Sequence, residues 1–153
     1  MRHLYIQVLW QDMTVDLEVI DPSLEQYGDR IEDMMSAPFI RHLGIELVSV
    51  MPNEVRMRMV LRPEFRNSNG VGHGGVIYTL ADHAAAIAAN VESDAVGQSG
   101  NMTYHRPLVS DEAEAVSTRI NSSRSLDVQD VRVYSAGKLI ASGVFTAFKV
   151  RKN

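Results

Sequence analysis

The segment 74–91, GGVIYTLADHAAAIAANV, predicts one long helix with apolar side chains on nearly every face. A helix that is apolar all round is buried by the rest of its protein, and the alanines let a β-sheet approach closely. Among its side chains, Asp82 and His83 alone ionise near neutral pH. A buried carboxylate costs free energy unless it is paired or hydrogen-bonded. Asp82 therefore needs a reason for its place, either functional or structural, such as an arginine partner.

Alternation of apolar and polar residues predicts strands on both sides of this helix. A hairpin turning at Pro52-Asn53 precedes the helix, and an antiparallel run ending in a tight turn at Ala136-Gly137 follows it. The expected strands are 45–51, 54–61, 96–105, 112–122, 126–135 and 138–150. This order of elements predicts an α+β fold, with the long helix packed against a sheet.

The first forty residues have mixed signals. Segments 4–10 and 14–20 are rich in β-forming residues and predict a hairpin or two edge strands. Segment 23–43 has a helical pattern, which Pro38 is expected to break into two pieces. A length of 153 residues fits a single domain, 1–153.

Composition excludes several classes of protein. A net charge of −4 with scattered Lys and Arg argues against a nucleic-acid binder, which needs a basic face. The lack of cysteine excludes disulfides, thiolate nucleophiles and Cys-ligated zinc. No uncharged apolar run approaches the roughly 18 residues of a membrane helix, and the first residues lack a signal-peptide cleavage site. We therefore expect no nucleic-acid or membrane partner and a cytoplasmic location.

Several familiar catalytic motifs are absent. There is no GxSxG nucleophile elbow, no GxGxxG and no P-loop lysine. His73, His83 and His105 have no metal-ligand spacing, so we expect no metal site.

Glycines crowd the start of the predicted helix, at positions 70, 72, 74 and 75. Glycine lets a ligand come close to the main chain, and the first N–H groups of a helix have no partner within it. With the helix dipole, such N–H groups can stabilise a developing oxyanion. His73, just before these glycines, also suits a simpler role as a hydrogen-bonding residue at the helix start.

The glycine end and the aspartate cannot act on one carbonyl from the same helix. Asp82 follows Gly74 by eight residues, which is about 12 Å along a helix axis. Reacting groups must come within roughly 3–3.5 Å. A two-fold dimer with two such helices side by side and antiparallel would bring the glycine end of one over the aspartate of the other.

The segment 66–82, RNSNGVGHGGVIYTLAD, resembles the signature of hotdog-fold thioesterases of the phenylacetic-acid-degradation (PaaI-like) type. That signature is an Asn, a short loop with Gly, then His-Gly-Gly, then Leu-x-Asp on the helix. Segments 101–107, NMTYHRP, and 137–143, GKLIASG, resemble the strand after that helix and the last hairpin. The resemblance covers about residues 30–150 and leaves 1–22 as an N-terminal extension.

The resemblance implies a long antiparallel sheet wrapped around one helix, and hydrolysis of an acyl- or aryl-acyl-CoA to the free acid and CoA. Asp82 would be the nucleophile or general base. The N–H of Gly74, at the helix start of the facing subunit, would polarise the thioester carbonyl. Asn67 and His73 would position the thioester or the water.

The resemblance also implies how the substrate and the subunits assemble. Gly75, Arg106 and Arg124 become candidates for substrate binding, the two arginines for the CoA phosphates, although each also suits a solvated surface position. The implied assembly is a homodimer that pairs into a homotetramer. No metal or organic cofactor is implied beyond the CoA of the substrate.

Two positions depart from the family pattern. Some relatives hold the attacking water with a Ser or Thr, which one branch has at the position of Ala86 and another at the position of Gly97. Ser99 and Thr79 are the candidate substitutes in this chain. A non-catalytic acyl-CoA-binding hotdog protein is therefore an alternative. A hotdog dehydratase is disfavoured, because it needs a His five residues after the Asp, where Ile87 stands.

Overall fold

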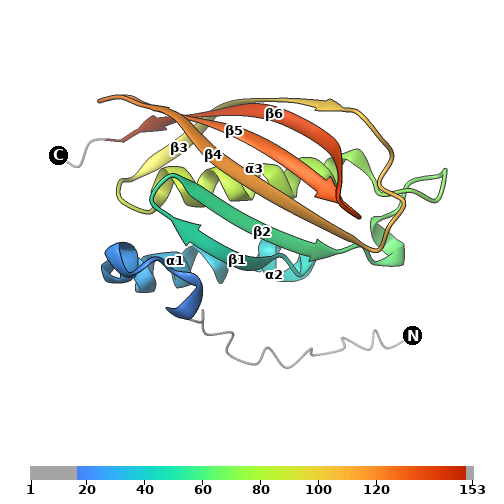
Figure 1. Cartoon of the computed structure of the whole chain (residues 1–153), viewed down its shortest axis with the longest axis horizontal. Coiled ribbons are helices and arrows are strands. Elements are labelled where there is room, and N and C mark those ends of the chain that lie inside the picture. The colour runs from blue at the N-terminus through green and yellow to red at the C-terminus, as the bar shows by residue number, and fades with distance from the viewer. Residues whose placement is uncertain (1–16, 151–153) are drawn as a thin grey trace, which may run out of the picture.

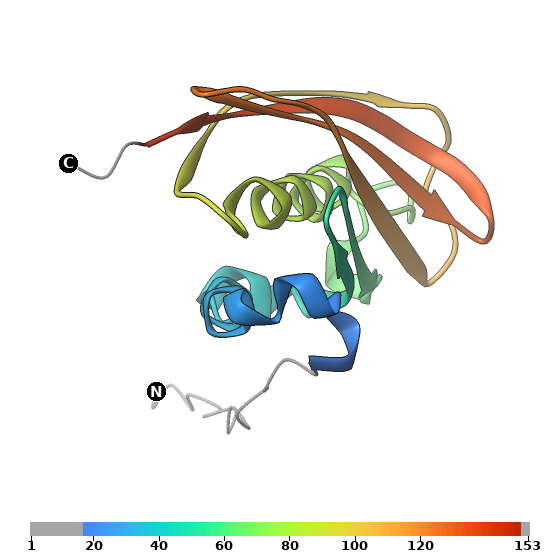
Figure 2. The same ribbon diagram turned by 60° about the vertical axis from the view of Figure 1, so that its left-hand side comes forward.

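The computed structural model describes residues 17–150, in which a curved antiparallel sheet arches over one side of a long helix, α3 (Gly74–Asn90) (Figure 1). Figure 2 shows α3 between this sheet and the short helices of the N-terminal region. This is the α+β hotdog arrangement that the sequence predicts. No helix among the described residues is long and apolar enough to cross a membrane.

The sheet has six strands in the order β1-β2-β4-β5-β6-β3. The predicted strands are confirmed to within one residue at each end, and α3 ends one residue earlier than expected. Strand β3 follows α3 in the chain but lies at the far edge of the sheet, beside β6. The strands are β1 (Glu46–Met51), β2 (Glu54–Val60), β3 (Ala95–Tyr104), β4 (Glu112–Ser122), β5 (Leu126–Ser135) and β6 (Lys138–Lys149).

The core lies between α3 and the inner face of the sheet. Leu80 and Ile87 of α3 and Met57 and Val133 of the strands are completely buried. Small side chains such as Ala84, also fully buried, let the sheet approach the helix. Truncating such a buried Leu to Ala typically costs about 2–5 kcal/mol of stability, so this layer holds the two ends of α3 in place.

Within the single chain, α3 is not covered on every face. Gly75 and Asp82 are exposed in the single chain. Thr79, which lies between them in the sequence, and Ala86, one turn after Asp82, are half-buried. These residues are spaced four, three and four apart, so they form one stripe along the helix. The sheet covers the opposite side, which leaves this stripe uncovered.

The N-terminal region differs from the sequence prediction in part. A strand over 17–20 is wrong, because these residues form a short 3₁₀ turn and a single bridge from Ile20 to Val50. The Asp21 carboxylate then accepts the N–H of Ser23 at 2.9 Å and caps a second 3₁₀ turn. The predicted strand 4–10, and residues 14–16 of the next, lie outside the described residues. The break at Pro38 is confirmed, since the helical elements are η1 (Leu17–Val19), η2 (Pro22–Tyr27), α1 (Gly28–Met35) and α2 (Pro38–Leu43).

Candidate active site

One backbone N–H at the start of α3 is left free. His73 is the N-cap residue, and its Nδ1 accepts the N–H of Gly75 at 2.9 Å. The N–H groups of Val76 and Ile77 donate to the carbonyl of His73, at 3.0 and 3.3 Å. Within residues 17–150, the Gly74 N–H donates no hydrogen bond. Gly74 therefore presents the unpaired donor of the first turn, where the helix dipole adds partial positive charge.

The loop before the helix is held by its own hydrogen bonds. The Asn67 Oδ1 accepts the N–H groups of Asn69 at 2.8 Å and Val71 at 3.4 Å. Gly70 has φ +75°, a backbone conformation that favours glycine. The His73 N–H donates to the carbonyl of Phe65 at 2.8 Å, which fixes the approach of the loop to α3.

Beside Gly74 lies an open cleft of about 310 Å³, which we call the glycine cleft. The Tyr104 hydroxyl donates to the carbonyl of Gly74 at 3.0 Å and forms one wall. The Arg106 guanidinium donates to the carbonyl of Leu139 at 2.9 Å at the rim. The cleft thus brings together three of the predicted site residues, and its lining includes Asn67, Gly72, Gly74, Ile77, Tyr104 and Arg106.

A second and smaller cavity, of about 100 Å³, opens beside Asp82 between α3 and the sheet; we call it the aspartate pocket. Burial of the surroundings raises the pKa of the Asp82 carboxyl, although the side chain itself is exposed. The wall on the helix side is mostly methyl groups. The lining includes Asp82, Ala85, Ala86, Ala89, Gly97, Ser99, Gln129 and Phe145.

The two cavities share no lining residue. Gly74 and Asp82 lie eight residues apart on one regular helix, so their separation along the axis is about 12 Å. Asn67, Gly74 and Arg106 therefore belong to one cavity of the chain, and Asp82 belongs to the other.

A hydroxyl for holding water is missing where the family pattern places it. Ala86 and Gly97 both line the aspartate pocket without a polar side-chain atom. The Thr79 hydroxyl donates to the Gly75 carbonyl at 2.9 Å, so it is already engaged. Ser99 is among the lining residues, but in the sheet it pairs with Thr146. The next pair along the two strands, Gly100 and Phe145, faces inward. Alternation therefore directs the Ser99 side chain to the outer face of the sheet.

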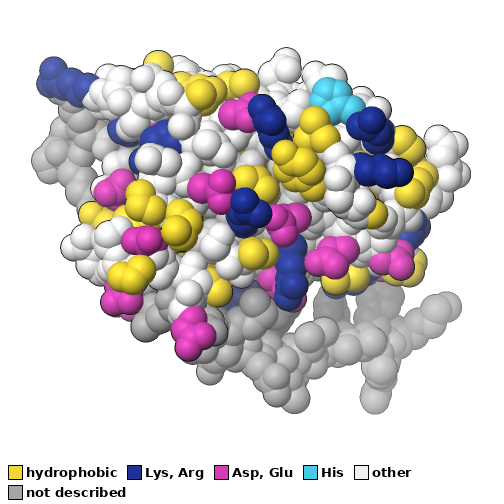
Figure 3. Space-filling view, in the orientation of Figure 1, with side chains coloured by type: hydrophobic (Ala, Val, Ile, Leu, Met, Phe, Trp, Pro, Cys, Tyr) yellow, Lys and Arg dark blue, Asp and Glu magenta, His cyan; other side chains and the backbone are white. Residues whose placement is uncertain are grey.

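A larger hollow lies elsewhere, on the outer face of the sheet. Figure 3 shows this face as a mixture of hydrophobic and charged side chains. Several of its charges pair with each other, as Arg56 does with Glu54 at 2.8 Å and Glu114 at 3.3 Å. Its lining residues come from strands and the turns between them, so no helix terminus opens into it. Within residues 17–150, no cluster of three or more His, Asp or Glu side chains could hold a metal ion.

Comparison with known proteins identifies the family. The model of the thioesterase superfamily matches residues 69–141, which contain the start of α3, Asp82 and β3. Human acyl-coenzyme A thioesterase 13 is 33% identical over 115 residues, which cover 71% of this chain and 82% of that protein. The chain belongs to the thioesterase superfamily. The TT0310 protein of Thermus thermophilus is similar at 37% identity, with a TM-score of 0.73 over 76% of this chain and 100% of that one.

A mutant of the phenylacetic acid degradation protein PaaI from the same organism is 36% identical, with a TM-score of 0.72 over 74% of this chain and 99% of that one. This thioesterase is thus a PaaI-like thioester hydrolase with the hotdog fold.

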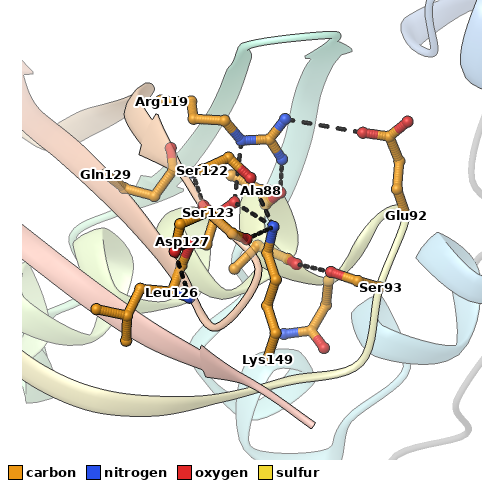
Figure 4. Close-up of polar contacts among 12 residues, drawn as sticks. Ala88, Glu92, Ser93, Arg119, Ser122, Ser123, Leu126, Asp127, Gln129 and Lys149 are labelled. Atoms are coloured by element: carbon orange, nitrogen blue, oxygen red, sulfur yellow. Dashed lines mark hydrogen bonds and ion pairs between the residues drawn. The ribbon is translucent and has the colours of Figure 1, made fainter. Parts of the chain in front are cut away.

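Reasoning from the sequence missed a buried polar network in this thioesterase (Figure 4). Asp127 and Gln129 on β5 are each 1% exposed, and Gln129 lines the aspartate pocket. A signal for both was present, because they alternate in phase with Val131 and Val133, which are buried on the inner face.

The two arginines predicted to bind substrate lie near opposite ends of strand β6 in this thioesterase. Arg106 contacts Leu139 near the start of β6. Arg124 lies in the turn between β4 and β5, where Ser123 accepts from Lys149 near the end of β6. Ten residues of strand separate these ends, or about 33 Å. One chain therefore does not bring both arginines to one ligand.

Proposed function

We propose that this thioester hydrolase acts on acyl-CoA, with Asp82 of one subunit and the Gly74 N–H of a second subunit at each active site. The observation that carries the proposal is the position of these two groups, a free donor and a carboxylate that open into different cavities of one chain. The name of the human relative, acyl-coenzyme A thioesterase 13, supports acyl-CoA as the substrate class.

Strand β3 suits the dimer contact that such a site needs. It is an edge strand, and Val96 and Tyr104 near its two ends are 61% and 48% exposed. Its Ala95 end lines the aspartate pocket, and its Tyr104 end lines the glycine cleft. Two-fold antiparallel pairing of β3 with its copy would set the aspartate pocket of each subunit beside the glycine cleft of the other. We expect such dimers to pair further into tetramers.

The chemistry then follows from the two groups. The partner's Gly74 N–H donates to the thioester oxygen and stabilises the negative charge that develops there. Asp82 either takes a proton from water while the water oxygen attacks the carbonyl carbon, or attacks that carbon itself to form an anhydride that water then hydrolyses. In both routes the C–S bond breaks, the CoA thiolate leaves and takes up a proton, and the free acid remains. Water and these groups suffice, so we propose no metal or organic cofactor.

The protonation states of the site fit this role. Asp82 must be ionised to act, and desolvation raises its pKa, which makes the carboxylate a better base. Because Nδ1 of His73 accepts a hydrogen bond, the neutral ring carries its hydrogen on Nε2. We propose that this N–H and the amide of Asn67 position the thioester or the water at the glycine cleft. The Gly75 N–H already donates to the N-cap residue His73. Gly75 would therefore contribute by letting the substrate come close to the backbone.

We propose that Arg106 and Arg124 contact the CoA phosphates from different subunits. Antiparallel pairing of β3 places the Arg106 end of one subunit toward the Arg124 end of the other, since these arginines mark opposite ends of β6. A guanidinium group can donate two parallel hydrogen bonds to two oxygens of one phosphate.

Release of CoA from a panel of acyl-CoAs tests the proposal. Asp82→Ala should lower kcat by about 10²–10⁴-fold, the usual contribution of a catalytic base or nucleophile. Gly74→Pro removes the free N–H at the first helical position, where proline is tolerated. The ψ of 134° at His73 suits a following proline. This variant should lose roughly 10²–10³-fold in kcat.

Gly74→Ala is the matched control for the glycine end. It keeps the N–H, and its methyl group would meet the Tyr104 ring at an ordinary 3.4 Å. It should therefore remain far more active than Gly74→Pro. Saturable acyl-CoA binding without turnover by the wild type, or turnover by folded Asp82→Ala at the wild-type rate, would contradict the proposal.

A further inference from the structure

The floor of the aspartate pocket contains a polar side chain that the proposed chemistry does not use. Gln129 is 1% exposed and faces α3 from β5, opposite Phe145 of β6. Most of the surrounding lining is apolar, with Ala85 and Ala89 on the helix side. The Asn90 amide, also in the lining, donates to the Ala86 carbonyl at 3.0 Å and accepts the Ala95 N–H at 2.8 Å, but this side chain is only half-buried, at the end of the helix. A buried amide in such a place is expected to form hydrogen bonds.

A network behind the pocket holds Gln129 in one orientation (Figure 4). Its Nε2 donates to the Oδ1 of Asp127, and its Oε1 accepts the Ser117 hydroxyl at 3.0 Å. The Asp127 carboxylate is held in turn by Arg119, whose Nε is 3.2 Å from Oδ2, and by the Lys149 Nζ at 3.9 Å. A flipped amide would set an oxygen against the carboxylate, which accepts hydrogen bonds only. The network therefore fixes which atoms of Gln129 remain for a ligand.

Gln129 retains hydrogen-bonding capacity after these contacts. An amide has two N–H hydrogens and two acceptor sites on its oxygen, and each atom here has one protein partner within residues 17–150. One hydrogen and one lone pair remain. A hydroxyl can use both, and a keto oxygen can accept the hydrogen, whereas a methyl group in the same place would leave both unsatisfied.

We propose that Gln129 is a specificity-determining residue and that the pocket takes a short acyl group bearing a hydroxyl or keto oxygen within a few carbons of the thioester. The proposal rests on the proposed function, because it assumes that the thioester carbonyl lies at Asp82 and the acyl group enters the pocket beside it. The volume of about 100 Å³ suits a group of a few heavy atoms. The oxygen must therefore stand near the thioester to reach the pocket floor.

A matched pair of substrates tests the proposal. 3-Hydroxybutyryl-CoA and 3-methylbutyryl-CoA differ only in a hydroxyl against a methyl group. The ratio of their kcat/KM values measures the discrimination directly. For wild-type enzyme we expect a ratio of at least about tenfold in favour of the hydroxyl substrate, which corresponds to one net hydrogen bond. Gln129→Met, of similar shape but without the amide, should bring the ratio to about one or below.

Two further variants keep the test decisive. Ser117→Ala removes the hydroxyl that holds Oε1 and should lower the ratio by a smaller factor, even if Gln129→Met does not fold. Phe145→Leu enlarges the same pocket without removing a hydrogen-bonding group, so it should change both kcat/KM values and leave their ratio near that of wild type.

Failure of the proposal and failure of the proposed function give different results. If wild type cleaves neither thioester nor any other acyl-CoA, the proposed function fails. If wild type cleaves both members of the pair at similar kcat/KM, or if Gln129→Met and Ser117→Ala keep the wild-type ratio, the assignment of Gln129 is overturned while acyl-CoA hydrolysis stands.

Discussion

Two neighbouring ionisable residues of α3 have opposite surroundings. Asp82 lies on the uncovered stripe of the helix, and His83 is turned toward the protein. Desolvation raises the pKa of the Asp82 carboxyl and lowers the pKa of the His83 imidazole to about 4. The His83 Nε2 is buried and has no hydrogen-bond partner within residues 17–150. Both shifts disfavour the charged form, so each residue costs stability where it is ionised in the folded state.

His83 should make the protein sensitive to acid between about pH 6.5 and pH 4. The unfolded chain takes up a proton near 6.5, while the folded chain resists it until about 4, so stability falls as pH drops through this window. Over the full window the loss is at most about 3 kcal/mol, at 1.36 kcal/mol per pKa unit. His83→Leu removes the proton-binding group. Urea unfolding of both proteins at pH 7, 6, 5 and 4.5 should show the variant losing less stability on acidification.

The exposed His42 provides the control for loss of a histidine. His42→Gln should follow the wild-type stability curve more closely than His83→Leu does. Parallel curves for wild type and His83→Leu across the whole range would mean that His83 is not held neutral by burial.

At the scale of residues, the sequence indicates which residues are candidates for the site better than it indicates what surrounds their side chains. Motif and helix-start chemistry select Gly74 and Asp82 as candidates, and their catalytic roles stay predictions. The exposure of Asp82 could not be predicted, because it depends on which side of α3 the sheet covers. The partners of Gln129 could not be predicted either, since Ser117, Asp127 and Gln129 come together only through the pairing of β4 with β5.

At the scale of elements, an arginine of α1 connects the N-terminal region to both ends of the α3–β3 connection. The Arg30 guanidinium donates to the carbonyls of Asn90 at 2.5 Å and Ser93 at 3.0 Å, and pairs with Asp94 at 2.5 Å. Asn90 is the last residue of α3, where carbonyl groups lack partners within the helix. This contact therefore fixes the end of α3 that borders the aspartate pocket.

Arg30→Met should destabilise the fold by about 2 kcal/mol, because half-buried carbonyl groups lose a charged donor. Arg132→Met is the matched control, since Arg132 pairs with Asp130 at 3.0 Å on the surface with 57% of its side chain exposed. An exposed pair of this kind is worth about 0–1 kcal/mol. Chemical denaturation of the two variants measures both costs, and equal losses would show that the Arg30 contacts contribute no more than a surface ion pair.

Strands and helices were predictable to different degrees along the chain. From residue 45 onward, alternation and turn residues give nearly the observed bounds, because every strand from β2 to β6 has one face on α3 and one face outward. The signal fails near the N-terminus. In the stretch 17–20, apolar alternation suits a strand, but the Asp21-Pro22 start of the next turn limits pairing to the Ile20 bridge.

At the scale of the whole molecule, each chain contains two separate cavities and an edge strand that lines both. The aspartate pocket and the glycine cleft lie at opposite ends of β3. If the active site is shared, a subunit with a defective aspartate and a subunit with a defective glycine end should complement each other. Such complementation depends on the pairing of chains and not on the stability of either one.

Mixed dimers provide that test. Asp82→Ala and Gly74→Pro chains with different affinity tags can be co-expressed and purified through both tags. In a shared-site dimer, one site contains both defects and the other contains neither, so the mixed dimer should recover about half of the wild-type acyl-CoA hydrolysis. The reciprocal pair joins a wild-type chain to a chain with both substitutions. Each of its sites then has one defect, so its activity should fall to the level of the single variants. The opposite pattern, an active reciprocal pair and no complementation, would place Gly74 and Asp82 in the same subunit's site.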